Sequence, residues 1–309
     1  MNTTATRLAG YAIALVVLFG TAYGIGQFVG PVDAAPPAGM ESGMGNGMGS
    51  GMASHDEGAG RDDRHDSGHG KEQGSEVPGG LQVSENGYTM VPVAAADGEF
   101  AFRITGPDGK PVTRYDIEHD KRMHLIVVRR DLSGFRHVHP TMSGDGTWRV
   151  AAPFGEPGSY RAYADFKPTG GEALTLGVDV AKPGDFSPRP LPAPAKTARV
   201  ADYTVTIDGT LRAGHSSKLT LTVSRDGKPV TDLQPYLAAY GHLVALRQGD
   251  LAYLHVHPDG EPGDGRTKAG PGISFYAEVP STGTYRLYLD FKHGGQVRTA
   301  EFTVVAGDE

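Results

Sequence analysis

The sequence predicts an all-β protein whose main part is two tandem β-sandwich domains. Three observations predict this fold class. From Leu81 onward, short runs rich in Val, Thr, Tyr and Phe alternate with Gly, Pro and Asp turns, which is typical of sandwiches and barrels. No segment after residue 40 keeps the 3.6-residue apolar period of a helix. A block of sequence occurs twice, which indicates two copies of one domain.

The N-terminal segment has the length and apolarity of a membrane span. Residues 8–32 carry no charge, and roughly 20 apolar residues cross a bilayer as a helix. Arg7 precedes the run, which favours an N-terminus inside the cell. We therefore expect residues 1–30 to be a single-pass transmembrane anchor of the cell membrane, with the rest of the chain extracytoplasmic. The alternative is a signal peptide cleaved near Ala34, which would give a secreted protein.

Residues 31–80 form a low-complexity segment rich in Gly, Ser, Asp and Pro, with no aromatic residue. Such a composition cannot bury enough apolar surface to offset the entropy of ordering, so it predicts a disordered tether. The tether contains evenly spaced methionines and then histidines: Met40, Met44, Met48, Met52, His55, His65 and His69. Thioethers suit Cu(I), and imidazoles suit Cu(II) and zinc. Either the tether binds copper in both oxidation states, or it is a spacer of biased composition.

The repeat divides the remaining chain into two domains. Gly109–Thr113 recurs as Gly227–Thr231, and the His-Val-His-Pro motif at His137 recurs at His255, both 118 positions later. Five prolines between positions 183 and 194 predict an extended, semi-rigid spacer. The expected order is domain 1 over 81–182, a linker over 183–198 and domain 2 over 199–309. The clearest expected strands are Glu99–Ile104, His124–Arg130, Ser159–Phe166, Lys218–Val223, His242–Arg247, Thr284–Phe291 and Arg298–Val305.

A predicted hairpin brings three histidines of domain 1 onto one face. Residues two apart in a strand share a face, so pairing Arg130 with Phe135 puts Ile126 opposite His139 and His124 diagonal to it. Three imidazoles at such separations can bind one metal ion. Domain 2 repeats the pattern, and domain 1 adds two further candidates. The predicted ligands are His119, Met123, His124, His137 and His139 in domain 1, and His242, His255 and His257 in domain 2.

The alternative is that these histidines are structural and bond to backbone or to carboxylates. Asp165 and Asp290, at matching positions of the two copies, are suitable partners. The two domains also differ, because Leu237 and Gly241 replace His119 and Met123 in the second copy.

Composition excludes several classes of function. The chain has no cysteine, so disulfides, thiolate metal sites and a blue-copper centre are ruled out. A net charge of −7 without a Lys/Arg block does not predict a nucleic-acid partner. The sequence contains no His-Glu-x-x-His, phosphate-loop or dinucleotide motif, so we do not predict an enzyme.

One run carries a family resemblance. Met123–Ser133, MHLIVVRRDLS, followed by Phe135–Pro140, FRHVHP, resembles a motif of uncharacterised bacterial secreted or membrane-anchored proteins described as heavy-metal-binding or copper-associated. Gly146–Trp148, Tyr160 and Asp165 continue the similarity. The resemblance implies an immunoglobulin-like, copper-resistance-like or cupredoxin-like sandwich outside the cytoplasm.

These expectations combine into one functional hypothesis and one alternative. The hypothesis is an extracytoplasmic, membrane-tethered protein that binds copper, with zinc as the other suitable ion, and buffers the ion or hands it to a transporter or cell-surface partner. The alternative is a non-catalytic immunoglobulin-like interaction module with structural histidines.

Overall fold

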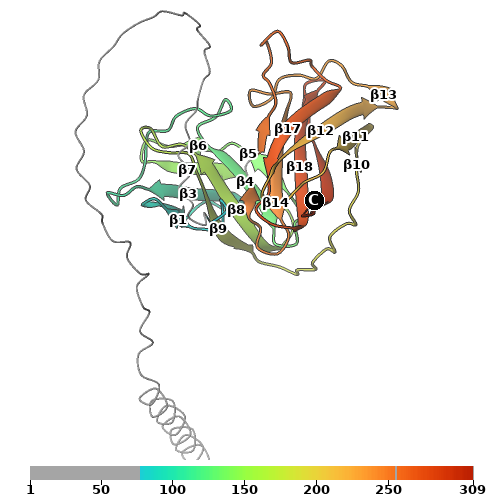
Figure 1. Cartoon of the computed structure of the whole chain (residues 1–309). Helices are drawn as coiled ribbons and strands as arrows, with labels where there is room; N and C mark the ends of the chain where they lie inside the picture. Colours follow the sequence, from blue (N-terminus) through green and yellow to red (C-terminus); the bar gives the residue numbers. More distant parts are fainter. Residues whose placement is uncertain (1–76, 255, 309) are drawn as a thin grey trace, which may run out of the picture. The chain divides into compact units, whose positions relative to one another are not determined.

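The computed structural model describes residues 77–254 and 256–308, and its regular elements there are all β-strands (Figure 1). The predicted fold class, two tandem all-β sandwiches, is confirmed. A search of the same residues finds no helix with the length and apolarity that a bilayer crossing needs. The expected anchor over residues 1–30 lies outside the described residues.

The first repeat is a sandwich of two antiparallel sheets, with strand orders β1-β2-β3-β7-β6 and β5-β4-β8-β9. Its strands are β1 (Ser84–Glu85), β2 (Tyr88–Val93), β3 (Glu99–Thr105), β4 (His124–Arg129), β5 (Arg136–Val138), β6 (Thr141–Met142), β7 (Thr147–Ala151), β8 (Gly158–Phe166) and β9 (Leu174–Lys182).

The second repeat has the same two-sheet plan, with orders β10-β11-β12-β17-β16 and β15-β14-β18-β19 and with β13 pairing β12. Its strands are β10 (Thr197–Val200), β11 (Tyr203–Asp208), β12 (Ser216–Arg225), β13 (Lys228–Pro229), β14 (Gly241–Arg247), β15 (Tyr253–Leu254), β16 (Val256–Pro258), β17 (Gly272–Glu278), β18 (Gly283–His293) and β19 (Gln296–Ala306).

The strand orders correspond to the immunoglobulin arrangement of an A-B-E-D sheet and a C′-C-F-G sheet. A second hallmark of that fold occurs in both repeats. The hydroxyl of Tyr160, near the start of β8, donates to the carbonyl of Glu156 at 2.5 Å. In β18 the hydroxyl of Tyr285 donates to the carbonyl of Ser281 at 2.7 Å. Each repeat is therefore immunoglobulin-like, with a tyrosine corner at strand F.

Strand β4 is buried at all six positions because both of its faces are covered. Leu125 and Val127 point into the core of repeat 1, together with Trp148. The alternate residues Ile126 and Val128 belong to a separate apolar cluster that joins the two repeats. The predicted alternation of the two faces is therefore correct, but neither face is exposed to solvent.

The joining cluster is formed by the outer faces of the two C′-C-F-G sheets. It pairs equivalent residues of the repeats: Ile126, Val128 and Tyr163 from the first, and Val244, Leu246 and Tyr288 from the second. The repeats thus share an apolar interface, rather than forming the two independent sandwiches that a proline-rich spacer predicts. Figure 1 shows β4 and β5 of the first repeat next to β14 of the second.

Reciprocal hydrogen bonds cross the same interface. The hydroxyl of Tyr163 donates to the carbonyl of Leu251 at 2.7 Å, and that of Tyr288 donates to the carbonyl of Leu132 at 2.6 Å. These two tyrosines hold one repeat to the other. Because both donors are buried, each bond also satisfies a polar group that would otherwise be costly to bury.

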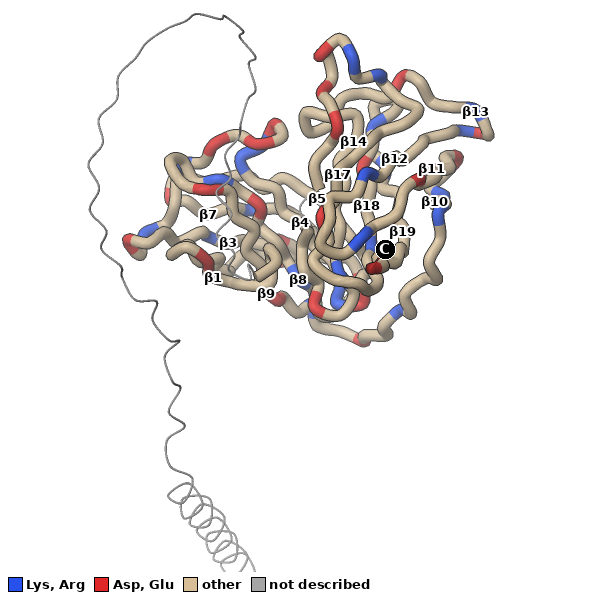
Figure 2. Tube along the Cα trace, in the orientation of Figure 1, with Lys and Arg blue, Asp and Glu red and all other residues tan. Residues whose placement is uncertain are grey.

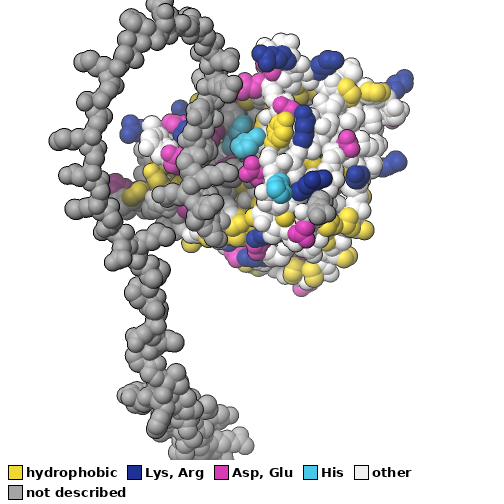
Figure 3. All heavy atoms as spheres, viewed as in Figure 1, with side chains coloured by type: hydrophobic (Ala, Val, Ile, Leu, Met, Phe, Trp, Pro, Cys, Tyr) yellow, Lys and Arg dark blue, Asp and Glu magenta, His cyan; other side chains and the backbone are white. Residues whose placement is uncertain are grey.

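Lysine and arginine positions are interspersed with aspartate and glutamate positions along the described trace (Figure 2). On the face drawn in Figure 3, lysine and arginine side chains lie singly among acidic and polar ones. This distribution offers no concentrated basic surface on that face for a polyanion.

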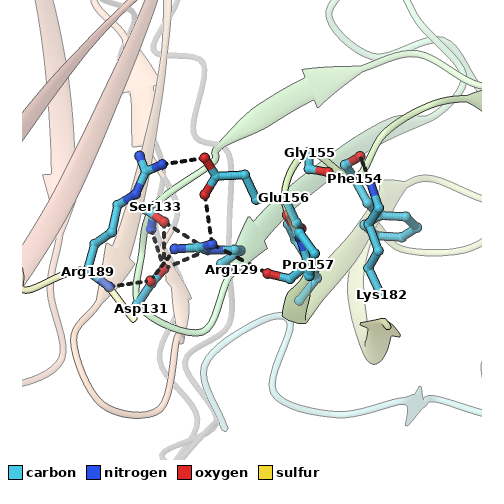
Figure 4. Close-up of polar contacts among 10 residues, drawn as sticks. Arg129, Asp131, Ser133, Phe154, Gly155, Glu156, Pro157, Lys182 and Arg189 are labelled. Atoms are coloured by element: carbon cyan, nitrogen blue, oxygen red, sulfur yellow. Dashed lines mark hydrogen bonds and ion pairs between the residues drawn. The ribbon is translucent and has the colours of Figure 1, made fainter. Parts of the chain in front are cut away.

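The predicted linker is held against repeat 1 by a polar network (Figure 4). The Arg129 guanidinium donates to Asp131 at 2.6 Å and to Glu156 at 3.1 Å. Within the linker, the amide of Arg189 donates to Asp131 at 2.8 Å, and the Phe186 ring lies 5.2 Å from the Arg129 guanidinium carbon. The linker is therefore anchored and does not act as a free spacer.

Contacts of repeat 1 begin before the expected boundary at residue 81. Gly79 forms a β-bridge with Tyr253 of the second repeat, and the Gly80 carbonyl accepts from Arg161 at 2.7 Å. Gly80 has a φ of +72° and lies against the Tyr163 ring, where a Cβ would overlap it. The last residues assigned to the tether thus belong to the folded part.

Candidate metal centre

The histidine hairpin forms, with a register two residues away from the expected one. Ile126 pairs with His137 and not with His139, so continuing the ladder places His139 across from His124. The turn closes one residue earlier because the Asp131 carboxylate accepts from the Ser133 amide at 3.1 Å, and Gly134 enters the left-handed region at φ 66°. A shift of two residues keeps each side chain on its predicted face.

Three histidines converge at the end of this hairpin. One ring nitrogen from each of His124, His137 and His139 lies within 4.8 Å of the other two. The closest pair is His124 Nδ1 and His137 Nε2, at 3.0 Å. His139 Nε2 is buried and has no hydrogen-bond partner among the described residues. The predicted domain 1 triad is thus assembled around one point.

The outward-facing nitrogens of two of these rings are fixed by acceptors. His124 Nε2 lies 3.1 Å from the carbonyl of Glu118. His137 Nδ1 lies 3.0 Å from Oδ2 of Asp290, and the two side chains are only 1% and 4% exposed. Oδ1 of Asp290 in turn accepts from the Thr299 hydroxyl at 2.5 Å. Asp290 belongs to the second repeat, so the centre spans both repeats.

A fourth and a fifth histidine adjoin the triad. The His242 ring is parallel to the His124 ring within 2°, at a centroid distance of 5.8 Å, and lies 4.8 Å from the His137 ring. His119 lies 5.8 Å from His242 and 6.2 Å from His124. His124 and His242 occupy equivalent strand positions, each opposite an aspartate on the next strand. The two repeats therefore meet through matching histidines.

Two predicted ligands are placed away from this cluster. Met123 packs in the apolar core of repeat 1, so its thioether is not available to the centre. His257 is exposed on β16, which pairs with β17 in the other sheet of repeat 2, so the second hairpin does not reproduce the first site. His255 and the tether ligands, Met40, Met44, Met48, Met52, His55, His65 and His69, lie outside the described residues.

The sequence did not indicate that Asp290 bonds a histidine of the other repeat. The matching positions of Asp165 and Asp290 were the available signal, but they suggested partners within each repeat. In repeat 1, Asp165 accepts from the Thr175 hydroxyl at 3.1 Å, as Asp290 accepts from Thr299. Only the packing of one repeat on the other brings His137 to Asp290.

Burial keeps three of these imidazoles neutral: His124, His139 and His242. Desolvation, with the neighbouring His137 as the next cause, lowers the pKa of His124 to about 3. Desolvation followed by His137 and Lys121 lowers the pKa of His139 to about 4. The pKa of His242 is held well below its ordinary value by the same desolvation and by its histidine neighbours. Neutral imidazole is the form that binds metals.

The hydrogen bonds determine which nitrogens carry protons. A carbonyl and a carboxylate only accept, so His124 must donate through Nε2 to Glu118 and His137 through Nδ1 to Asp290. In the neutral His124 ring, Nδ1 is then a lone-pair nitrogen, and it faces His137 Nε2 at 3.0 Å. The contact is a hydrogen bond when His137 Nε2 carries a proton, and a metal ion can take the place of that proton.

The chain belongs to the family described as Domain of unknown function (DUF8832), which matches it twice, over residues 76–182 and 198–308. The two matches coincide with the two sandwiches. Comparison with curated proteins gives no match.

The similarity to solved structures is limited. Invasin, a bacterial integrin-binding protein, is 13% identical, covering 70% of this chain and 39% of its own, with a TM-score of 0.20. A putative membrane-anchored protein from Corynebacterium diphtheriae is 10% identical, covering 71% and 57%, with a TM-score of 0.21. The Ig1-2 module of the Drosophila receptor tyrosine phosphatase DLAR is 11% identical, covering 75% and 97%, with a TM-score of 0.18. None of these likenesses bears on function.

Proposed function

We propose that this protein is an extracytoplasmic metal-binding protein that holds copper at the histidine centre between its repeats and buffers the ion or hands it on. One observation carries the proposal: ring nitrogens of three histidines, His124, His137 and His139, lie within 4.8 Å of one another. Two of these nitrogens, His124 Nδ1 and His137 Nε2, face each other at 3.0 Å. A metal ion bound there would replace the proton that otherwise bridges the two rings.

The donor set supports a transition metal. Three imidazoles in a buried position suit copper, zinc or nickel. His139 offers a buried nitrogen with no partner among the described residues, as a ligand would before it binds. Asp290 would orient His137 in the carboxylate–histidine arrangement common at metal sites.

Copper is preferred over zinc because the tether carries thioethers, which suit Cu(I), beside imidazoles, which suit Cu(II). The methionines and histidines of the tether would gather ions of either copper oxidation state and pass them to this centre.

Thermal unfolding of the full-length protein with Cu(II) tests the proposal. A ligand that binds only the folded state adds about 2.7 kcal/mol of stability at 100 times its dissociation constant, so copper should raise the melting temperature. Ions that the tether binds equally well before and after the sandwiches unfold do not produce this rise. His139→Ala removes the buried nitrogen that has no partner, so it should abolish the rise with little cost to the metal-free fold.

His215→Ala is the matched control, because His215 is an exposed histidine of the second repeat and should keep the full copper effect. An equal rise in His139→Ala, or no rise in the wild type, would refute the proposal. In the second case the histidines would serve the interface of a non-catalytic interaction module. A parallel titration with Zn(II) should give a smaller rise than Cu(II).

A further inference from the structure

The candidate centre is placed on the contact between the repeats, although its triad comes from one hairpin. His137 of repeat 1 is bonded to Asp290 of repeat 2 at 3.0 Å. His124 of repeat 1 lies parallel to its equivalent, His242 of repeat 2. The apolar cluster that joins the repeats continues along the same strands. In β14, for example, Val244 of this cluster is two residues after His242. Any ion at the triad is therefore within reach of side chains from both repeats.

Ring separations support a ligand from the second repeat. Two imidazoles bound to one ion have ring centres about 4.5 Å apart at a right angle and about 6.4 Å apart when opposite. The rings of His124, His137 and His139 are 5.0 to 5.2 Å apart. The His242 ring lies 4.8 Å from that of His137 and 5.8 Å from that of His124. The distances from His242 to His137 and to His124 both fall in the range for a shared ion. Among the described residues, the ring nitrogens that already lie within 4.8 Å of one another are those of His124, His137 and His139.

We infer that His242 is a ligand of the same ion, so that one metal ion binds both repeats at once. The inference rests on the proposed function and adds a partner to it: the second repeat supplies a ligand through His242 and a positioning residue through Asp290. Separating the repeats would remove both from the centre. Metal occupancy and the docking of the repeats therefore stabilise each other.

In this arrangement the complete metal centre needs both repeats. A single sandwich holds only the triad, and its His137 would lack the carboxylate that fixes the proton on Nδ1. Docking also places the His242 ring against those of His137 and His124. A signal or partner that pulls the repeats apart would release the ion by removing a ligand and re-solvating the others.

The test measures copper affinity and unfolding cooperativity in the full-length protein. Affinity comes from the melting-temperature rise across a Cu(II) titration. Trp148 is the only tryptophan and lies in the core of repeat 1, so its fluorescence follows that repeat, whereas circular dichroism follows both. We expect His242→Gln and Asp290→Asn each to weaken copper binding by at least about 10-fold. We also expect copper to merge the two unfolding curves in the wild type but not in these variants.

The two variants keep side-chain volume, and either one alone decides the matter if the other does not fold. His215→Ala controls for loss of a histidine in repeat 2. Unchanged affinity in both variants, with binding abolished by His139→Ala, would overturn the inference and leave the proposed function standing. Absence of any copper effect in the wild type would overturn both.

Discussion

Acidification of the metal-free protein should cost a predictable amount of stability. His124 and His139 have pKa values of about 3 and about 4 in the folded protein, against about 6.5 in an unfolded chain. When folding lowers the pKa of a histidine, the neutral ring makes its full contribution to stability above the pKa of the unfolded chain. That contribution is lost as the pH falls from about 6.5 towards the pKa of the folded protein.

At pH 5 each ring is about 1.5 units below its unfolded pKa, which corresponds to about 2 kcal/mol per ring. Acidification from pH 8 to pH 5 should therefore lower the free energy of unfolding by about 4 kcal/mol through the two rings together. This is a large share of the 5 to 15 kcal/mol that is typical of a domain. Urea unfolding of the full-length, metal-free protein at both pH values, followed by Trp148 fluorescence, measures this loss.

The matched variant is His124→Gln with His139→Gln, in which neither position titrates. Its stability should fall far less between pH 8 and pH 5, whereas His215→Ala should behave as the wild type does. Equal losses in the wild type and the double variant would show that the two rings are not held neutral. That result would also remove the argument that these two rings are held in the form that binds metals.

Two further predictions concern the contacts that hold the repeats and the linker in place. Gly80→Ala should lower stability by about 2 kcal/mol, because alanine is strained at φ +72° and its Cβ would overlap Tyr163; an unchanged urea midpoint would contradict this. Arg129→Ala should cost about 3 kcal/mol, because it leaves the buried Asp131 carboxylate without its ion-pair partner. Arg103→Ala, which breaks an exposed pair, should cost under about 1 kcal/mol and serves as its control in the same urea titration.

The Asp131 carboxylate illustrates why the two arginine variants should differ. Burial alone would raise its pKa, but hydrogen bonds from Arg129, the Arg189 amide and Ser133 lower it to about 2. The carboxylate is therefore ionised at neutral pH and depends on these donors. Removal of the strongest donor leaves a charge that the interior cannot solvate.

Much of the fold follows from local features that the sequence displays directly. Period-two alternation along His124–Arg130 predicted which residues share a face, because successive side chains of a strand point to opposite sides. Turn residues separated the strands, and the recurring His-Val-His-Pro block marked two copies. The triad of His124, His137 and His139 was predicted from the same alternation, and it survived a two-residue error in register because such a shift preserves the face.

The sequence alone determined two β-sandwiches and a histidine triad on one hairpin, since both depend on residues close together along the chain. The tertiary structure decided which other histidines lie beside that triad. His242 does and His257 does not, because one outer sheet face packs on its equivalent and the strand of His257 pairs with the opposite sheet. Asp290 reaches His137 for the same reason. Packing between distant segments depends on the shapes of two assembled surfaces, and no local pattern encodes it.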